Sequence, residues 1–215
     1  MHNDHRNMTM TAALALACMT MLAACASTPS AMPNVRYDLG VAPAIDQSAN
    51  STPATTPATT PPVKVLAVSA PRNLETDDFI YRLSYVDAQR TGNYSNSHWT
   101  MPPAQLLTQR LRDSLSARGP VLTGADPVRA ALLEIELTRF EQVFDAPERS
   151  HGLVAVRATL TQQGRVVAQR SFSTEASAPT GDAAGGARAL AAASNEMISQ
   201  LSAWLDKQPL TAAAK

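Results

Sequence analysis

The sequence predicts an α+β fold in which two amphipathic helices cover one face of a mixed β-sheet. Runs of alternating apolar and polar residues, typical of half-buried strands, occupy the middle of the chain. Two longer segments instead carry apolar residues at helical spacing. The order strand, strand, strand, helix, three strands, helix fits a layer of helices on a sheet. A lipidated flexible tether is expected to precede this domain.

The first three predicted strands are short. They are identified by alternation of apolar residues or by β-branched composition, and they lie at residues 35–39, 63–68 and 79–83. The polar segment Asn93 to His98 that follows is rich in Asn and Ser, so we expect it to be a loop.

The first predicted helix begins near Thr100, which we expect to cap it, with Pro102 and Pro103 in the first turn. Its apolar stripe recurs every four residues, at Leu107, Leu111 and Leu115. Gly119 and Pro120 provide the stop. The opposite side of the helix is predicted to be polar and to carry Arg110, Arg112 and Arg118.

Three further strands and a second helix complete the domain. Alternating residues predict strands at 133–138 and 154–160, and Gln163-Gly164 predicts a tight hairpin turn into a strand at 166–174. Asp182 is the predicted cap of a long alanine-rich helix. Its apolar stripe consists of Leu190, Ala193, Met197, Leu201 and Trp204.

The N-terminus has the pattern of a lipoprotein signal peptide. An apolar run from Met8 to Ala24 is short for a membrane-spanning helix and ends in Leu22-Ala23-Ala24-Cys25. Small residues before a cysteine suit a peptidase that cuts at a lipid-modified thiol. Residues 1–24 are therefore predicted to be removed. Cys18 is a poorer site because a leucine stands where a small residue is needed, and the true start could be Met1, Met8 or Met10.

Cys25 is the predicted lipid attachment site, where acyl chains such as palmitate anchor the protein to a membrane. The alternatives are an ordinary secretory signal cut after Ala24 and a chance apolar start on a cytosolic protein. Ala26 follows the cysteine where an aspartate commonly signals retention in the inner membrane of a Gram-negative cell. We therefore expect attachment to the outer membrane, facing the periplasm.

The mature chain is expected to be one domain on a tether. Residues 25–34 form the tether, 35–207 the α+β domain, and 208–215 a disordered tail. Within the domain, the Thr/Pro-rich segment 47–62 is expected to be an extended linker, because it lacks the apolar surface needed to offset the entropy of ordering. Glycan attachment on its threonines is the alternative role.

Composition excludes several function classes. The chain has 18 basic and 18 acidic residues and no Lys/Arg cluster, so nucleic acid is not an expected partner. Only His98 and His151 follow Cys25, neither in a metal-ligand spacing nor beside a nucleophile motif. We therefore expect no enzymatic activity, no metal site and no cofactor.

Several motifs together resemble the auxiliary lipoproteins of ABC-type transporters that work with MCE-domain proteins. They are the Cys25 motif, Arg36–Leu39, the stretch from Asn73 to Arg82, His98–Pro103 opening a leucine-striped helix, and the alanine-rich helix ending at Trp204. Two departures are a longer Thr/Pro linker and the acidic stretch Glu75–Asp78.

The resemblance implies a non-catalytic outer-membrane lipoprotein that helps to move phospholipids or other lipophilic compounds across the periplasm. Its partner would be the MCE-domain protein of the transport system. The alternative is a structural or assembly lipoprotein of the envelope, such as a secretion or lipopolysaccharide-export accessory. The oligomeric state is open.

Four aromatic residues are candidates for partner binding: Tyr81, Tyr85, Tyr94 and Trp99. They fall close together around predicted loops and strand ends, where aromatic side chains can form a contact patch. Core packing explains them equally well from sequence alone.

Overall fold

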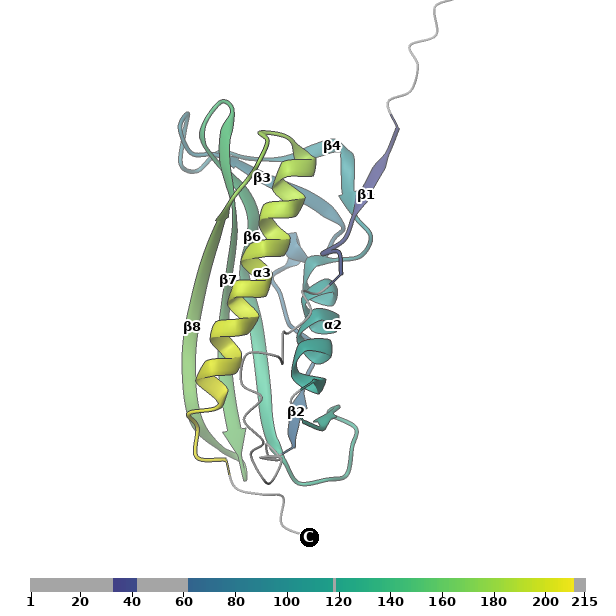
Figure 1. Ribbon diagram of the computed structural model, residues 1–215, viewed down its shortest axis with the longest axis vertical. Coiled ribbons are helices and arrows are strands. Elements are labelled where there is room, and N and C mark those ends of the chain that lie inside the picture. The colour runs from purple at the N-terminus through teal and green to yellow at the C-terminus, as the bar shows by residue number, and fades with distance from the viewer. Residues whose placement is uncertain (1–32, 42–61, 118, 211–215) are drawn as a thin grey trace, which may run out of the picture. The chain divides into compact units, whose positions relative to one another are not determined.

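An eight-stranded mixed sheet forms the framework of the computed structural model (Figure 1), which describes residues 33–41, 62–117 and 119–210. The strands are β1 (Val35–Tyr37), β2 (Val63–Val65), β3 (Asp78–Leu83), β4 (Thr91–Trp99), β5 (Val121–Leu122), β6 (Ala131–Ala146), β7 (Arg149–Gln162) and β8 (Arg165–Ser177). The helices are the short 3₁₀ helix η3 (Arg72–Leu74), α2 (Pro103–Ser116) and α3 (Ala183–Leu205). The predicted α+β class is confirmed.

The long strand β6 organises the sheet. One of its edges pairs along its length with β7, which pairs in turn with β8, both antiparallel. The other edge is shared between two parallel neighbours: β2 pairs with residues 131–133, and β3 pairs with residues 142–144. β4 and β1 continue the sheet beyond β3, and β5 continues it beyond β2. The upper part of Figure 1 therefore contains β1, β3 and β4, and the lower part contains β2.

The predicted turn at Gln163 and Gly164 is confirmed. Both residues have positive φ, 52° and 75°, as the tight turns that join twisted antiparallel strands require. β7 and β8 extend well beyond the predicted strands, since β7 spans Arg149–Gln162 and β8 spans Arg165–Ser177.

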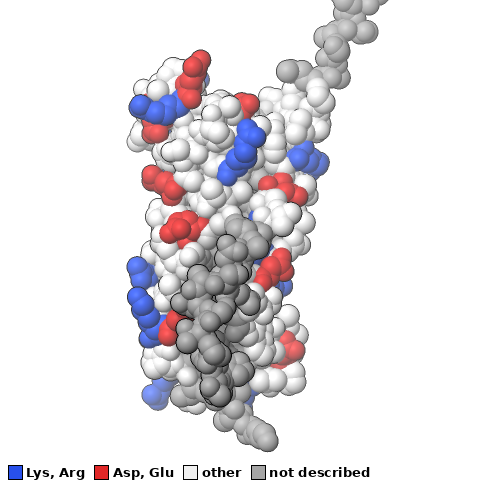
Figure 2. All heavy atoms as spheres, viewed as in Figure 1, with Lys and Arg blue, Asp and Glu red and all other residues white. Residues whose placement is uncertain are grey.

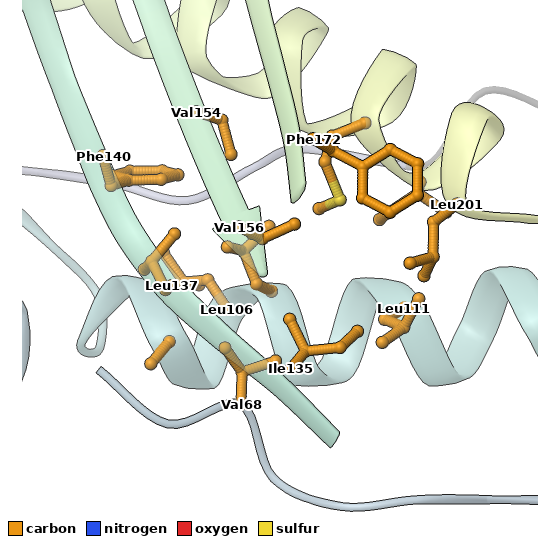
Figure 3. Packing of buried hydrophobic residues seen from close by; sticks show 14 of the residues in the cluster. Val68, Leu106, Leu111, Ile135, Leu137, Phe140, Val154, Val156, Phe172 and Leu201 are labelled. Atoms are coloured by element: carbon orange, nitrogen blue, oxygen red, sulfur yellow. The ribbon is translucent and has the colours of Figure 1, made fainter. Parts of the chain in front are cut away.

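The hydrophobic core lies between the sheet and the two helices. Figure 3 shows Leu106 and Leu111 of α2 and Leu201 of α3 pointing toward sheet residues such as Ile135 and Val156. All five residues are buried. The predicted stripes of both helices are buried, which confirms that one face of the sheet is covered by two amphipathic helices.

Gly152 allows α3 to pack closely against β7. A Cβ atom at this position would lie 2.5 Å from the backbone nitrogen of Leu190. No L side chain fits at that distance from helix backbone. The start of α3 is capped as predicted, because the Asp182 carboxylate accepts a hydrogen bond from the Gly185 amide at 2.8 Å.

Three sequence-based expectations are wrong. Residues Asn93 to His98 are not a loop but belong to β4, whose polar residues pair with β3 and β1. The residue preceding the first turn of α2 is Pro102 rather than Thr100, and no side chain caps that helix. Arg110 does not lie on a polar, solvent-exposed side of α2, since it is 6% exposed.

Other expectations fall on residues outside the described ranges. These are the signal peptide 1–24, Cys25 and most of the tether, most of the linker 47–62, and the end of the C-terminal tail. Among the helices that the structure describes, none combines the length and the hydropathy needed to cross a bilayer.

Candidate functional site

Three of the four candidate aromatic residues lie near one end of the sheet, on β3, β4 and the turn between them. Tyr81 of β3 stacks near Tyr94 of β4, with ring centroids 5.0 Å apart, and its ring meets the edge of Phe144 at the end of β6 at 6.1 Å. Tyr85 follows β3, and its backbone amide donates a hydrogen bond to the carbonyl of Phe144 at 3.3 Å. β3, β4 and β6 therefore position this group together.

Trp99 is instead part of the core. Its side chain is fully buried, at 0% exposed, and its ring lies 4.6 Å from that of Phe79 and 5.2 Å from that of Phe140. It is the last residue of β4 and belongs to the hydrophobic core. Trp99 is therefore withdrawn from the candidate partner surface, which keeps Tyr81, Tyr85 and Tyr94.

An uncharged hollow of about 310 Å³ lies beside these tyrosines. Its lining comes from β3, β4, the end of β6 and the loop before α3, and consists of Tyr81, Leu83, Asn93, Tyr94, Ser95, Phe144 and Gly181. Because this lining is apolar, aromatic or neutral polar, it suits an uncharged aliphatic or aromatic group better than an ion.

A buried hydrogen-bond network fixes one wall of this hollow. The Tyr94 hydroxyl donates to Oε1 of Gln142 at 3.0 Å, and Nε2 of Gln142 donates to Oγ of Ser150 at 2.8 Å and to the carbonyl of Asp182 at 3.2 Å. Burial, with the nearby negative charge of Asp182, raises the pKa of Tyr94 to about 12. Tyr94 therefore stays protonated near neutral pH and acts as a neutral donor.

The turn from Ser84 to Arg90 carries two exposed apolar side chains. Tyr85 is 45% exposed and Val86 is 54% exposed. The backbone beneath them is held firmly, because the Leu83 amide donates to the Arg90 carbonyl at 3.0 Å and the Ser84 hydroxyl donates to the Phe144 carbonyl at 2.6 Å. Tyr85 and Val86 are thus presented to solvent by a well-braced turn.

A second hollow, of about 250 Å³, is polar. Its lining includes Arg82, Arg139 and the buried carboxylate of Glu141. Nη2 of Arg82 lies 2.9 Å from Oε2 of Glu141, and Nε of Arg139 donates to Oε1 at 2.8 Å. Both guanidinium groups are therefore paired with the same carboxylate, and Asp78 adds a further negative charge to the lining. This charge balance gives little basis for binding an anion.

Asp77, Asp78 and His98 form an acidic and imidazole cluster that sequence analysis missed. Their candidate ligand atoms all lie within 4.8 Å of one another. The missed signal was the strand character of β4, which pairs His98 with Asp78. Asp77 accepts a hydrogen bond from Arg36 at 2.8 Å, which lowers its pKa, and Asp78 accepts one from Thr76 at 2.9 Å. The Arg36–Asp77 contact attaches β1 to the sheet, and both carboxylates already accept hydrogen bonds from protein side chains.

Arg110 is the other residue that sequence analysis misplaced. From α2 its guanidinium donates hydrogen bonds to the carbonyl oxygens of Leu39 and Gly40, the latter at 2.7 Å. Burial lowers the pKa of Arg110. Leu39 is itself 6% exposed. Arg110 therefore clamps the segment 38–40, directly after β1, onto α2.

The charged side chains that Figure 2 shows are of both signs along the whole described face. This distribution agrees with the equal numbers of basic and acidic residues in the chain. On this face the structure offers no electrostatic reason for binding a polyanion.

Comparisons with known proteins identify the family. Two solved structures share the fold: a Xanthomonas campestris protein of family DUF330, 20% identical with a TM-score of 0.61, and an uncharacterized protein, 16% identical with a TM-score of 0.64. The first match covers 80% of this chain and 91% of the other, and the second covers 81% and 99%. A search of curated proteins found no match. A family model described as the ABC-type transport auxiliary lipoprotein component matches residues 39–203, and the chain belongs to that family.

Proposed function

We propose that this protein is the outer-membrane lipoprotein of an ABC transport system and works with its MCE-domain protein to move phospholipids or other lipophilic compounds across the periplasm. The observation that carries the proposal is the family match over residues 39–203, together with the Leu22–Cys25 motif that precedes it. The protein itself acts without catalysis, and ATP hydrolysis by the transporter supplies the energy.

The attachment of the N-terminal segment supports a mechanical role. β1 pairs with β4, Arg36 binds Asp77, and Arg110 holds the carbonyls of Leu39 and Gly40. Three independent contacts therefore connect the chain that leads from Cys25 to the folded domain. A lipid anchor at Cys25 would hold the whole domain at the membrane, and so would hold the outer end of the transport assembly there.

The anchor is tested with two cysteine variants of the full chain. Cys25→Ser should abolish lipid attachment and leave an uncleaved or mislocalised precursor, whereas Cys18→Ser should be processed normally. Mass spectrometry of the mature N-terminus and fractionation of the two membranes provide the measurements. An unmodified N-terminus at Ala26, or an inner-membrane location, would contradict the proposal.

The partner is tested by crosslinking in cells, followed by purification of the tagged full chain and identification of its partners. We expect an MCE-domain protein and the subunits of an ABC transporter. Recovery of a secretion or lipopolysaccharide-export barrel, without these proteins, would favour the assembly-lipoprotein alternative and overturn the proposed function.

A further inference from the structure

The turn between β3 and β4 exposes apolar side chains for which the described residues provide no cover. Tyr85 and Val86 are 45% and 54% exposed, although eight hydrogen bonds of the surrounding backbone and side chains brace the turn. The uncharged hollow lined by Tyr81, Leu83, Tyr94 and Phe144 lies beside it. We call Tyr85, Val86 and this hollow the hairpin surface.

The amino end of β1 faces the same end of the sheet as this turn. β1 runs parallel to β4, with Val35 opposite Ser97 and Tyr37 opposite Trp99. The amino end of β1 therefore points toward the Thr91 end of β4, which is the end that adjoins the turn. Figure 1 shows the start of β1 and the β3–β4 turn both in the upper part of the domain, on opposite sides of the view.

The length of the tether limits how far this end can be from the membrane. Ten residues separate Cys25 from Val35. Even a fully extended chain spans about 3.3 Å per residue, so Val35 lies within about 35 Å of the lipid attachment point. The tether thus keeps Val35, and the end of the sheet at which β1 begins, within reach of the bilayer. The loop before β6 lies at the opposite end of a strand of 16 residues.

The chemistry of the hairpin surface suits a bilayer surface. Tyrosine has an apolar ring and a polar hydroxyl, and such amphipathic aromatic side chains are enriched where headgroups meet acyl chains. Val86 adds apolar area beside it. The charged residues of the turn, Asp87 and Arg90, have opposite signs, so the turn carries no net charge to oppose contact with anionic headgroups.

We propose that the hairpin surface is a second membrane contact: Tyr85 and Val86 insert at the headgroup level of the bilayer that holds the Cys25 lipid, and the hollow behind them receives part of an acyl chain. This inference rests on the lipid anchor of the proposed function. Two contacts, one covalent and one through side chains, orient the domain on the membrane with the loop before β6 pointing away from it.

The test uses two variants of the full, lipidated protein, each with an indole added at one end of the folded domain. Tyr85→Trp probes the hairpin surface, and Val128→Trp is the matched control, because Val128 is 42% exposed in the loop before β6. Native Trp99 and Trp204 are buried, at 0% and 7% exposed, and provide a constant background that the wild-type protein measures. Each protein is reconstituted into phosphatidylethanolamine and phosphatidylglycerol vesicles with or without brominated acyl chains, which quench indole emission on contact.

The wild-type emission is first subtracted from that of each variant. We then expect brominated lipid to reduce strongly the emission of the added indole in Tyr85→Trp and to leave that of Val128→Trp unchanged. Absence of quenching at position 85, or equal quenching at both positions, would overturn the inference. A third outcome would also overturn the inference: brominated lipid does not quench the indole at position 85, but its emission shifts when the purified transport partner is added. That result would assign the hairpin surface to a protein partner.

Vesicle flotation separates this inference from the proposed function. Wild-type protein that fails to float with vesicles lacks the anchor, which defeats the proposed function and the inference built on it. Protein that floats but is not quenched at position 85 defeats the inference alone. Neither result depends on the identity of the transporter.

Discussion

Replacement of Trp99 by alanine should strongly destabilise the domain, because this fully buried side chain packs against Phe79 and Phe140 in the core. A large aromatic side chain buries about 150–250 Å². At about 25 cal/mol per Å² this burial is worth about 4–6 kcal/mol. Alanine retains a small part of it, and a cavity remains where the ring was.

One feature of Trp99 reduces the expected loss. Its indole Nε1 is buried and has no hydrogen-bond partner among the described residues, so its removal relieves a desolvation cost of about 1–3 kcal/mol. The expected net loss for Trp99→Ala is therefore about 3–4 kcal/mol, within the range found for large-to-small core substitutions. Trp99→Phe keeps much of the ring packing and removes the unpaired N–H, so it should cost clearly less.

Urea unfolding followed by far-ultraviolet circular dichroism measures these changes without relying on tryptophan emission. Tyr85→Ala is the surface control and should change the free energy of unfolding by no more than about 0.5 kcal/mol. A loss below about 1 kcal/mol for Trp99→Ala, comparable with Tyr85→Ala, would show that Trp99 does not pack as described and would return it to the candidate partner surface.

Three further predictions concern the close packing at Gly152, the Arg110 clamp and the half-buried Tyr94. Gly152→Ala should cost about 1–3 kcal/mol in urea unfolding, because its Cβ would meet α3 backbone that cannot yield cheaply; an unchanged midpoint would contradict the packing. Arg110→Met keeps an apolar stem but loses both carbonyl contacts, so limited proteolysis should cut segment 35–41 faster while the remaining domain resists; equal cleavage rates would refute the clamp. The Tyr94 hydroxyl, whose pKa is raised to about 12, binds its proton more tightly in the folded than in the unfolded state. Its contribution to the free energy of unfolding is therefore complete below about pH 10 and is lost as the pH rises toward 12. Screening at this half-buried site limits that loss to about 1 kcal/mol. Tyr94→Phe has no hydroxyl to ionise and should not show this loss. The difference in urea midpoint between the wild-type protein and Tyr94→Phe should therefore be smaller above about pH 10 than below it.

The candidate site was predictable only in part. Tyr81, Tyr85 and Tyr94 come from neighbouring strands and the turn that joins them, so sequence proximity was enough to place them near one another. Trp99 is equally close in sequence, but it is buried in the core, where it packs against Phe140 of the distant strand β6. Arg110 resembles a solvent-facing arginine by helical position, and the carbonyls that bind it belong to a segment about seventy residues earlier in the chain.

Local sequence determined the features that depend on local geometry: the alternation of β6 and β7, the positive-φ turn at Gln163 and Gly164, the Asp182 cap and the apolar stripe of α3. Only the tertiary structure decided that the polar residues of β4 form a strand, because their backbone groups are satisfied by β3 and β1 rather than by neighbours in sequence. It also decided which aromatic side chains are covered and where the N-terminal segment is held. The physical reason is the same in each case. Turns, caps and periodicity depend on residues within a few positions, whereas burial and sheet pairing depend on which distant segments meet.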